Sequence, residues 1–524
     1  MSQVVIRGNL SSANFPLLAE LSGRSIVVRQ YDQNYTPPVS SKEDADKDIG
    51  IPELLYCENV LPTEHGYQSV GYSSPVNSAG VTFADCVESN GYTFACTSGA
   101  VNRKVFVLGL VGDWVEISAT VLLPTYMGKL HVAVLNGVIY LLVIGSTVGI
   151  YSYDPNTQAL SVVTLTGITL GTTVLGMLAC QGYLLIYTNK EVYWSSLVTP
   201  TDFTPSLATG AGGGAVQALK GDIITCVPHT TGFLIYSTEN IIAVPYSGNN
   251  RYPFIFREIP SSAGLLTTYT TPAVASDPTT GNHYAVTKAG LQLVSMQQSQ
   301  GVFPDVSDFL ANGKINSFNQ TTNTISISST VSISTVRLTT VADRYLFISY
   351  GTTTGSPYLD YENILIYDSV LKRWGKLVHN HKFVITSGFR ALVDTRAQFG
   401  KNTFNLLTYS GQGYAAVTST EDISGLTASG VAVIGKYQHV RSRLIQLQTV
   451  EVENVKSTST FSCSDLYTLD GKTFNVKDGT LLYSTQNLRK YGFGSVVGVN
   501  HSLLFKGAFN LVTIQLAFNI HGRR

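Results

Sequence analysis

Residues 181–187 read Gln-Gly-Tyr-Leu-Leu-Ile-Tyr, a turn pair followed by an apolar run that begins with an aromatic residue. Such a run, preceded by glycine and rich in aromatic and β-branched residues, is typical of a β-strand after a tight turn. Further copies of the pattern, some of them looser, lie at residues 90–95, 136–143, 231–236, 281–286, 342–348 and 402–407. The leading aromatic residues are about 43 to 61 positions apart. Repeats of about 40 to 50 residues with several strands each are typical of β-propeller blades.

The rest of the chain has the same strand-and-turn texture, and only residues 15–21 and 306–311 are predicted to form short helices. Within a repeat, an apolar strand ends in Tyr-Asp, as at residues 153–154 and 367–368, and Trp374 follows the second of these. This order resembles the kelch arrangement of a blade, in which Asp caps a turn and the aromatic residue packs between blades. We therefore predict an all-β protein with a β-propeller of six or seven blades between about residues 54 and 416.

The two ends of the chain lie outside this repeat. Residues 1–53 contain one predicted strand, Ser25–Gln30, and a polar loop. Residues 417–524 contain long strands of strictly alternating polarity, which bury one face and leave the other polar. We predict a separate β-rich platform domain for assembly, built from these C-terminal strands, with the N-terminal strand as a candidate to pair with them. Long open strand edges in such a domain favour pairing between subunits.

The composition excludes several classes of protein. Apolar residues make up 44% of the 524 residues, which excludes a disordered chain, and the 34 basic and 34 acidic residues balance. This balance argues against a dedicated nucleic-acid binder and removes self-repulsion between copies. No secretion signal is visible in residues 1–9, and the longest apolar stretch, Gly137–Tyr151, is too short to span a bilayer, so we predict no stable membrane insertion.

The six cysteines are scattered without a C-x-x-C pair, and we interpret them as small buried hydrophobic residues in a reducing compartment. Cys86 and Cys96 could instead face each other across a hairpin.

Three patterns imitate binding sites but depart from them. The glycine-rich residues 209–215 are not followed by Gly-Lys-[Ser/Thr] and a helix, so we predict a flexible loop between strands. Residues 44–48 begin like a calcium loop, but Ile49 and Leu55 stand where such a loop needs Gly and Glu. The pair His379 and His381 points both imidazoles to one face of a strand, but no third ligand lies nearby in the sequence.

Signatures of catalysis are missing as well. The chain has no S-x-D-x-G-x-x-W box of sialidase propellers and no G-x-S-x-G elbow. A widely spaced pair of carboxylates, as in five-bladed glycosidases, remains open because sequence alone cannot reveal it. We predict no catalytic, cofactor-binding or metal-binding residues, no cofactor and no enzymatic activity.

Two segments resemble a known family. Residues 58–72 read Glu-Asn-Val-Leu-Pro-Thr-Glu-His-Gly-Tyr-Gln-Ser-Val-Gly-Tyr and resemble the "N-x-x-P…G-x-…-x-G-[FY]" opening of tail proteins from short-tailed bacteriophages. Residues 193–205 read Tyr-Trp-Ser-Ser-Leu-Val-Thr-Pro-Thr-Asp-Phe-Thr-Pro and look like their "YWS-x-x-x-P-x-D-F" segment. As in that pattern, a glycine-rich stretch, Gly-Asp-Ile at residues 221–223 and a Gly-Phe-Leu-Ile-Tyr strand follow. The resemblance covers residues 54–260, and the remainder shares only its general texture.

The resemblance implies a tail nozzle or tail-stabilisation protein, which is a structural component of the virion synthesised in the host cytoplasm. It implies a homo-oligomer, a hexameric ring below the portal and adaptor, that contacts tail fibre or tail needle proteins. Viral DNA would pass through the ring without sequence recognition, and the family supplies no catalytic residues. From the strand pattern we expect Leu444–Val452 and Leu511–Phe518 to carry the contacts between subunits, while the propeller projects outward.

Two alternatives stay open. A host-receptor-binding tail component would form a trimer, and a carbohydrate-binding or carbohydrate-cleaving propeller would be a monomer with one pocket and paired acids. The number of subunits distinguishes the three.

Overall fold

We describe the protein from a computed structural model. The described residues are 3–9, 53–63, 66–72, 76–77, 82–89, 91–97, 103–108, 114–266, 273–277, 280–319, 324–332, 336–341, 344–351, 361–385, 404–408, 412–418, 427–428, 430–438, 444–454, 461–469, 475–485, 488–494 and 496–520. The predicted helix at residues 15–21, the strand at 25–30 and the acidic residues 44–48 lie outside them.

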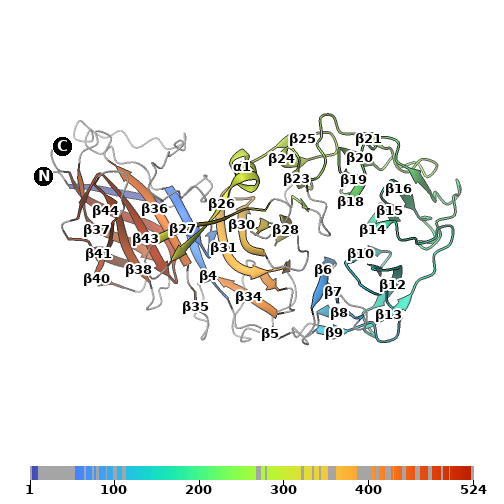
Figure 1. The fold of residues 1–524 in the computed structure, drawn as a ribbon, viewed down its shortest axis with the longest axis horizontal. Helices are drawn as coiled ribbons and strands as arrows, with labels where there is room; N and C mark the ends of the chain where they lie inside the picture. The colour runs from blue at the N-terminus through green and yellow to red at the C-terminus, as the bar shows by residue number, and fades with distance from the viewer. Residues whose placement is uncertain are drawn as a thin grey trace.

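Five four-stranded antiparallel sheets follow one another along the chain (Figure 1). Blade 1 consists of β6 (Phe83–Ser89), β7 (Tyr92–Thr97), β8 (Val105–Leu108) and β9 (Trp114–Glu116). Blade 2 consists of β10 (Lys129–Leu135), β11 (Val138–Ile144), β12 (Val148–Asp154) and β13 (Ala159–Val162). Blade 3 consists of β14 (Val174–Cys180), β15 (Tyr183–Thr188), β16 (Glu191–Trp194) and β17 (Gly212–Ala215). Blade 4 consists of β18 (Ile223–His229), β19 (Gly232–Ser237), β20 (Ile241–Pro245) and β21 (Arg257–Glu258). Blade 5 consists of β22 (Val274–Ser276), β23 (His283–Thr287), β24 (Gly290–Val294) and β25 (Ser299–Gly301).

The last two blades complete the propeller. Blade 6 consists of β28 (Arg337–Val341), β29 (Tyr345–Tyr350), β30 (Tyr361–Asp368) and β31 (Arg373–His381). Blade 7 takes three strands from the C-terminal side, β32 (Phe383–Ile385), β33 (Phe404–Leu407) and β34 (Gln412–Thr418). Its outer position is filled from much earlier in the chain by β4 (Gly66–Tyr72) and β5 (Val76–Asn77), which both pair with β34. This pairing closes the ring.

Each pair of neighbouring blades shares one buried apolar cluster. Tyr183 and Phe233, two of the aromatics that open the sequence repeats, lie in the cluster between blades 3 and 4. The cluster that joins blade 7 to blade 1 includes Phe383 and Phe83. The prediction of an all-β propeller is therefore confirmed, and within the described residues it has seven blades. The repeated aromatic packs between blades, which is why it recurs at blade spacing.

The predicted helix at residues 306–311 is also confirmed. It forms α1 (Pro304–Asn312), which follows blade 5 and places Val306 and Leu310 in the cluster between blades 5 and 6. The hairpin β26 (Lys314–Asn319) and β27 (Thr324–Thr330) comes next.

The two ends of the chain build a β-sandwich beside the propeller, which we call the terminal sandwich (Figure 1). One sheet has the order β2 (Glu53–Glu58), β36 (Gly430–Gln438), β43 (Asn500–Gly507), β38 (Ser462–Thr468), β39 (Asn475–Asp478). The other has β1 (Gln3–Asn9), β44 (Asn510–Ile520), β37 (Ile445–Asn454), then β41 (Leu488–Gly492) with β42 (Val497–Gly498), and β40 (Thr480–Ser484). Apolar residues of both sheets form one core between them.

Strand β2 places the domain boundary differently from the sequence analysis, which began the propeller at residue 54. Leu54 and Cys57 pair with β36 and lie in the sandwich core. The hairpin of β3 (Val60–Thr63) and β4 then joins the two domains, because β3 pairs with β31 of blade 6 while β4 pairs with both β34 and β44. The short β35 (Thr427–Ala428) also pairs with β4.

The glycine-rich segment corrects another expectation. Residues 212–215 are not a flexible loop but β17, the fourth strand of blade 3, paired with β16. Gly213 and Gly214 have φ angles of 150° and 148°, which a residue with a side chain rarely adopts. Glycine therefore lets the backbone of this strand lie directly against Tyr193.

Replacing Gly213 with alanine should destabilise blade 3 more than replacing Gly214 does. A Cβ at Gly213 would meet Tyr193 Cα at 2.6 Å, whereas a Cβ at Gly214 meets nothing within 4 Å. Because both positions share the same backbone strain, we expect the clash to lower the free energy of unfolding of Gly213→Ala by about 1–3 kcal/mol relative to Gly214→Ala. Urea denaturation of the two variants measures the difference, and equal midpoints would contradict the close packing.

Candidate assembly surface on the terminal sandwich

The strands that the sequence analysis expected to carry subunit contacts lie inside a sheet. β37 pairs with β44 on one side and with β41 and β42 on the other, and β44 pairs with β37 on one side and β1 on the other. Ile445, Val450 and Leu516 are buried in the sandwich core. The open edges expected for residues 444–452 and 511–518 are therefore absent, because alternating polarity marks a strand with one buried face but not one with a free edge. That these strands carry subunit contacts stays a prediction.

The exposed end of the sandwich consists of β39 and β40, which follow each other in the chain and belong to opposite sheets. Every residue of both strands is exposed, and β40 reads Thr-Leu-Leu-Tyr-Ser without a charge. Leu481, Leu482 and Tyr483 are 49%, 58% and 53% exposed. Full burial of an exposed leucine contributes about 1.5–3 kcal/mol of free energy. Because these side chains are half-exposed, a partner that covers them would gain roughly half of that binding free energy from each. Adjacent exposed apolar side chains on an edge strand are typical of an interaction site.

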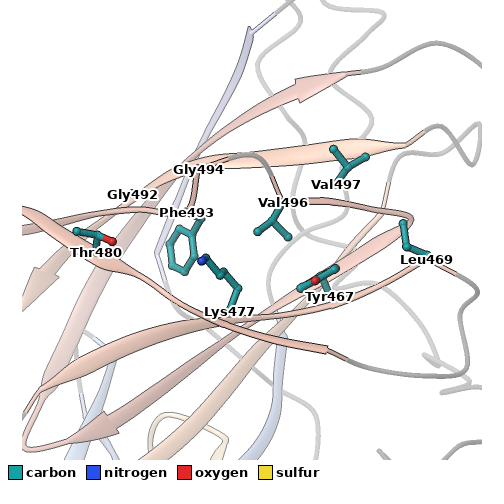
Figure 2. Close-up of a pocket in the computed structure, with 9 residues that line it drawn as sticks. All are labelled: Tyr467, Leu469, Lys477, Thr480, Gly492, Phe493, Gly494, Val496 and Val497. Carbon is teal, nitrogen blue, oxygen red and sulfur yellow. The ribbon is translucent and has the colours of Figure 1, made fainter.

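A pocket of about 640 Å³ opens beside these two strands. Strands from both sheets contribute to its wall, which consists of Tyr467, Leu469, Lys477, Thr480, Gly492, Phe493, Gly494, Val496 and Val497. In Figure 2 the side chains of Lys477, Phe493 and Val496 point toward one another across it. We call this pocket together with residues 475–484 the assembly surface. Its mixture of apolar wall, one ammonium group and the hydroxyls of Tyr467 and Thr480 suits a protein side chain from a partner better than a metal ion.

A buried histidine–aspartate pair lies behind the pocket. Tyr467, in the pocket wall, stacks on His501 with ring centroids 6.3 Å apart. His501 Nε2 donates to the carbonyl oxygen of Ile445 at 3.0 Å, and Nδ1 lies 2.8 Å from Asp465 Oδ2. Both side chains are fully buried, and among the described residues no donor reaches Asp465 Oδ1. Burial raises the pKa of the Asp465 carboxyl, and the adjacent His501 side chain opposes the rise.

The raised pKa predicts a pH-dependent stability that Asp465→Asn should remove. The folded protein holds the Asp465 proton more tightly than the unfolded chain, so this group stabilises fully below its ordinary pKa of 3.8 and less as the pH rises through the raised pKa. We therefore expect the wild type to lose stability relative to Asp465→Asn in urea denaturation as the pH rises above 3.8, through the raised pKa.

A matched control is Asp154→Asn. Asp154 is exposed, and hydrogen bonds from Asn156 and Thr157 lower its pKa, so its removal should leave the wild-type profile unchanged over that pH range. If the free energy of unfolding had the same pH dependence in the wild type and in Asp465→Asn, the burial of Asp465 would not raise its pKa.

A second buried pair fixes the sandwich to the propeller. Lys376 Nζ of blade 6 lies 3.8 Å from Glu58 Oε1 of β2, with the two side chains 1% and 10% exposed. Tyr56 donates a hydrogen bond to Glu58, and the Lys376 ammonium lies 5.1 Å from the centre of the Tyr56 ring. Burial lowers the pKa of Lys376, and the Glu58 carboxylate opposes this. This buried ion pair therefore links β2 of the sandwich to β31 of the propeller.

The first segment quoted for the family resemblance forms this junction with its described residues, 58–63 and 66–72. The Asn59 side-chain oxygen accepts hydrogen bonds from Val378 N of blade 6 at 3.0 Å and from the Tyr72 hydroxyl at 2.9 Å. Ser69 and Phe509 exchange hydrogen bonds, Ser69 N to Phe509 O and Phe509 N to Ser69 Oγ, both at 2.8 Å. The motif thus has a structural task, which is to hold the sandwich at a fixed angle to blades 6 and 7.

The second phage-like segment, residues 193–205, belongs to β16 and the loop after it. Trp194 Nε1 donates to Gly210 O at 2.9 Å, and Asp202 Oδ1 accepts from Thr204 N at 2.9 Å and from Thr166 Oγ1 at 3.0 Å. These contacts fix the loop against blade 3.

The histidine pair is accounted for by local contacts. His381 is buried with Nε2 at 2.8 Å from Ser349 Oγ, and His379 lies against the Tyr72 ring at 4.4 Å. Burial lowers the pKa of His381 to about 3. In the part of the chain that the structure describes, no three His, Cys, Asp or Glu side chains gather as metal ligands, and all six cysteines are free and buried.

The residues of the assembly surface were missed by sequence reasoning. The signal was present in the uncharged run Thr480–Ser484, but such a run usually forms a buried strand. Among the described helices none has the length and apolar character needed to cross a membrane.

No family model matches the chain, and no curated protein matches it. Among solved structures, the extracellular domain of the hybrid two-component system BT3049 from B. thetaiotaomicron is similar at 12% identity and a TM-score of 0.36, over 65% of this chain. The chain spans 40% of that protein's length.

Two further structures are similar to a comparable degree. The WD40 β-propeller domain of Doa1 shares 9% identity at a TM-score of 0.35, over 66% of this chain and 96% of its own. YCF48 bound to a D1 peptide shares 11% identity at a TM-score of 0.35, over 68% and 97%. The chain is thus an all-β protein built on a β-propeller, an architecture that its own strand order and inter-blade cores define.

Proposed function

We propose that this chain is a structural virion protein of a bacteriophage tail. It forms a ring of identical subunits, a nozzle or hub below the portal and adaptor, through which viral DNA leaves. The terminal sandwich serves as the assembly platform, and the propeller projects from it toward tail fibre or tail needle proteins.

The observation that carries this proposal is the exposed, uncharged apolar end of the terminal sandwich at Leu481, Leu482 and Tyr483. An isolated protein rarely leaves such an edge uncovered, since it invites association. The formal net charge of zero removes electrostatic repulsion between copies. The buried Glu58–Lys376 pair and the β3–β4 hairpin support a fixed angle between platform and propeller, which a closed ring requires.

The test is electron microscopy of the purified full chain. We expect sixfold rings with a central opening wide enough for duplex DNA and seven-bladed densities at the periphery. Rings without an opening, or particles without rotational symmetry, would overturn the proposal.

One observation favours a second candidate, the host-receptor-binding tail component. Val198, Leu207, Tyr252 and Ile255 are exposed on the loops after β16 and β20 of the neighbouring blades 3 and 4, at the side of the propeller away from the sandwich (Figure 1). A trimer in the same images would favour this alternative.

A further inference from the structure

The second sheet of the terminal sandwich has two open edges on opposite sides. Its order runs from β1 through β44, β37 and β41 to β40 (Figure 1). Among the described residues, β1 pairs only with β44 and β40 pairs only with β41. The backbone N–H and C=O groups on the outer side of both strands therefore lack a strand partner within the described chain.

We propose that this sheet continues from one copy of the chain to the next, with β40 of one copy pairing with β1 of its neighbour. The inference rests on the proposed ring and deepens it, because it names the strands that build the subunit contact. Each copy then offers one edge on either side, and the same contact repeats around the ring.

Strand directions support this arrangement. Four strand pairings lie between β1 and β40 in this sheet, namely β1–β44, β44–β37, β37–β41 and β41–β40, and all four are antiparallel. Because their number is even, β1 and β40 run in the same direction. Copies related by rotation place β1 of one beside β40 of the next as a parallel pair. A contact between two different surfaces closes into a ring, whereas two copies of β40 could pair only about a twofold axis and would stop at a dimer.

The exposed apolar side chains of β40 favour its burial against a neighbouring chain. The pairing of β40 with β41 shifts register between Leu481 and Tyr483, and the resulting irregularity bends the strand at Leu482. Three consecutive apolar side chains are left on the surface there, next to the pocket lined by Thr480 and Phe493. A neighbouring β1 would cover them and extend the apolar core across the junction.

Register in β1 agrees with such an extension. Val4 and Ile6 stand opposite Phe518 and Leu516 of β44, and Leu516 is buried in the sandwich core. The seven residues of β1 are also enough to match all five residues of β40.

The test is disulfide cross-linking between copies of the full chain. Leu482→Cys is combined with a cysteine at each position of β1 in turn, from residue 3 to residue 9. The native cysteines are buried and should not interfere. We expect one or two positions to give a ladder of covalent oligomers that ends at the size of the ring. Leu482→Cys alone, and the exposed Val162→Cys on blade 2 as a matched control, should give no ladder.

A second variant measures the strength of the contact. Leu482→Lys places a charge on the exposed β40 and should weaken ring formation at least tenfold, while Val162→Lys at the exposed end of β13 should not. Native mass measurement of the wild type separates the possible failures. Rings that form without cross-links to β1 and tolerate Leu482→Lys overturn this inference and leave the proposed function standing. A covalent dimer from Leu482→Cys alone overturns it in favour of twofold pairing, and a wild type without rings overturns the proposed function itself.

Discussion

Replacing Glu58 with leucine is expected to lower the free energy of unfolding by about 3–5 kcal/mol, because it leaves the Lys376 ammonium buried without this carboxylate. Tyr56 loses its hydrogen bond to Glu58 in the same step. Urea denaturation monitored by fluorescence measures the change. The loss should appear as an uncoupling of the two domains, since Glu58 belongs to the sandwich and Lys376 to blade 6.

The double variant Glu58→Leu/Lys376→Met is the control for this prediction. It removes both charges and keeps the volume, so it should recover most of the stability that the single variant loses. The pair would be a minor contributor if Glu58→Leu changed the free energy of unfolding by less than about 1 kcal/mol.

The substitution Val70→Asp should destabilise the propeller by about 4 kcal/mol, because it buries a carboxylate at the strand that closes the ring. Val70 is 1% exposed, belongs to the cluster between blades 6 and 7, and pairs with Thr418 of β34. The matched control is Val162→Asp. Val162 is 66% exposed on the outer strand of blade 2, so the same substitution there should change stability by no more than about 0.5 kcal/mol.

Thermal or urea unfolding of the two valine variants gives the comparison. Equal stability of Val70→Asp and Val162→Asp would mean that β4 does not close the seventh blade.

Sequence reasoning identified the propeller because the signal is local and repeated. A glycine turn followed by an aromatic-led run places one residue, such as Tyr183 or Phe233, in the core between blades, and the run itself is a buried strand. Such features lie within a few residues of one another, so they can be recognised without knowing the fold.

Two of the errors have a common cause, which is pairing between distant residues. Residues 54–58 have the composition of a blade strand, but they pair with β36, which lies far along the chain. The long alternating strands β37 and β44 were expected to have open edges, but they pair with each other and with further strands of the same chain. Nothing in a strand's own sequence states which of its edges is covered.

The glycine-rich strand β17 was missed for a different reason. Residues 212–215 have almost no side chains, so no polarity pattern could reveal a strand there. The assembly surface was missed because the run of residues 480–484 predicts burial, and its exposure depends on where the edge of the sandwich lies.

The most direct test of the account is a native mass measurement of the intact chain at near-neutral pH. The account predicts a complex of six copies, each of 56.5 kDa. A monomer at the same concentration would contradict the assignment of the terminal sandwich as an assembly platform.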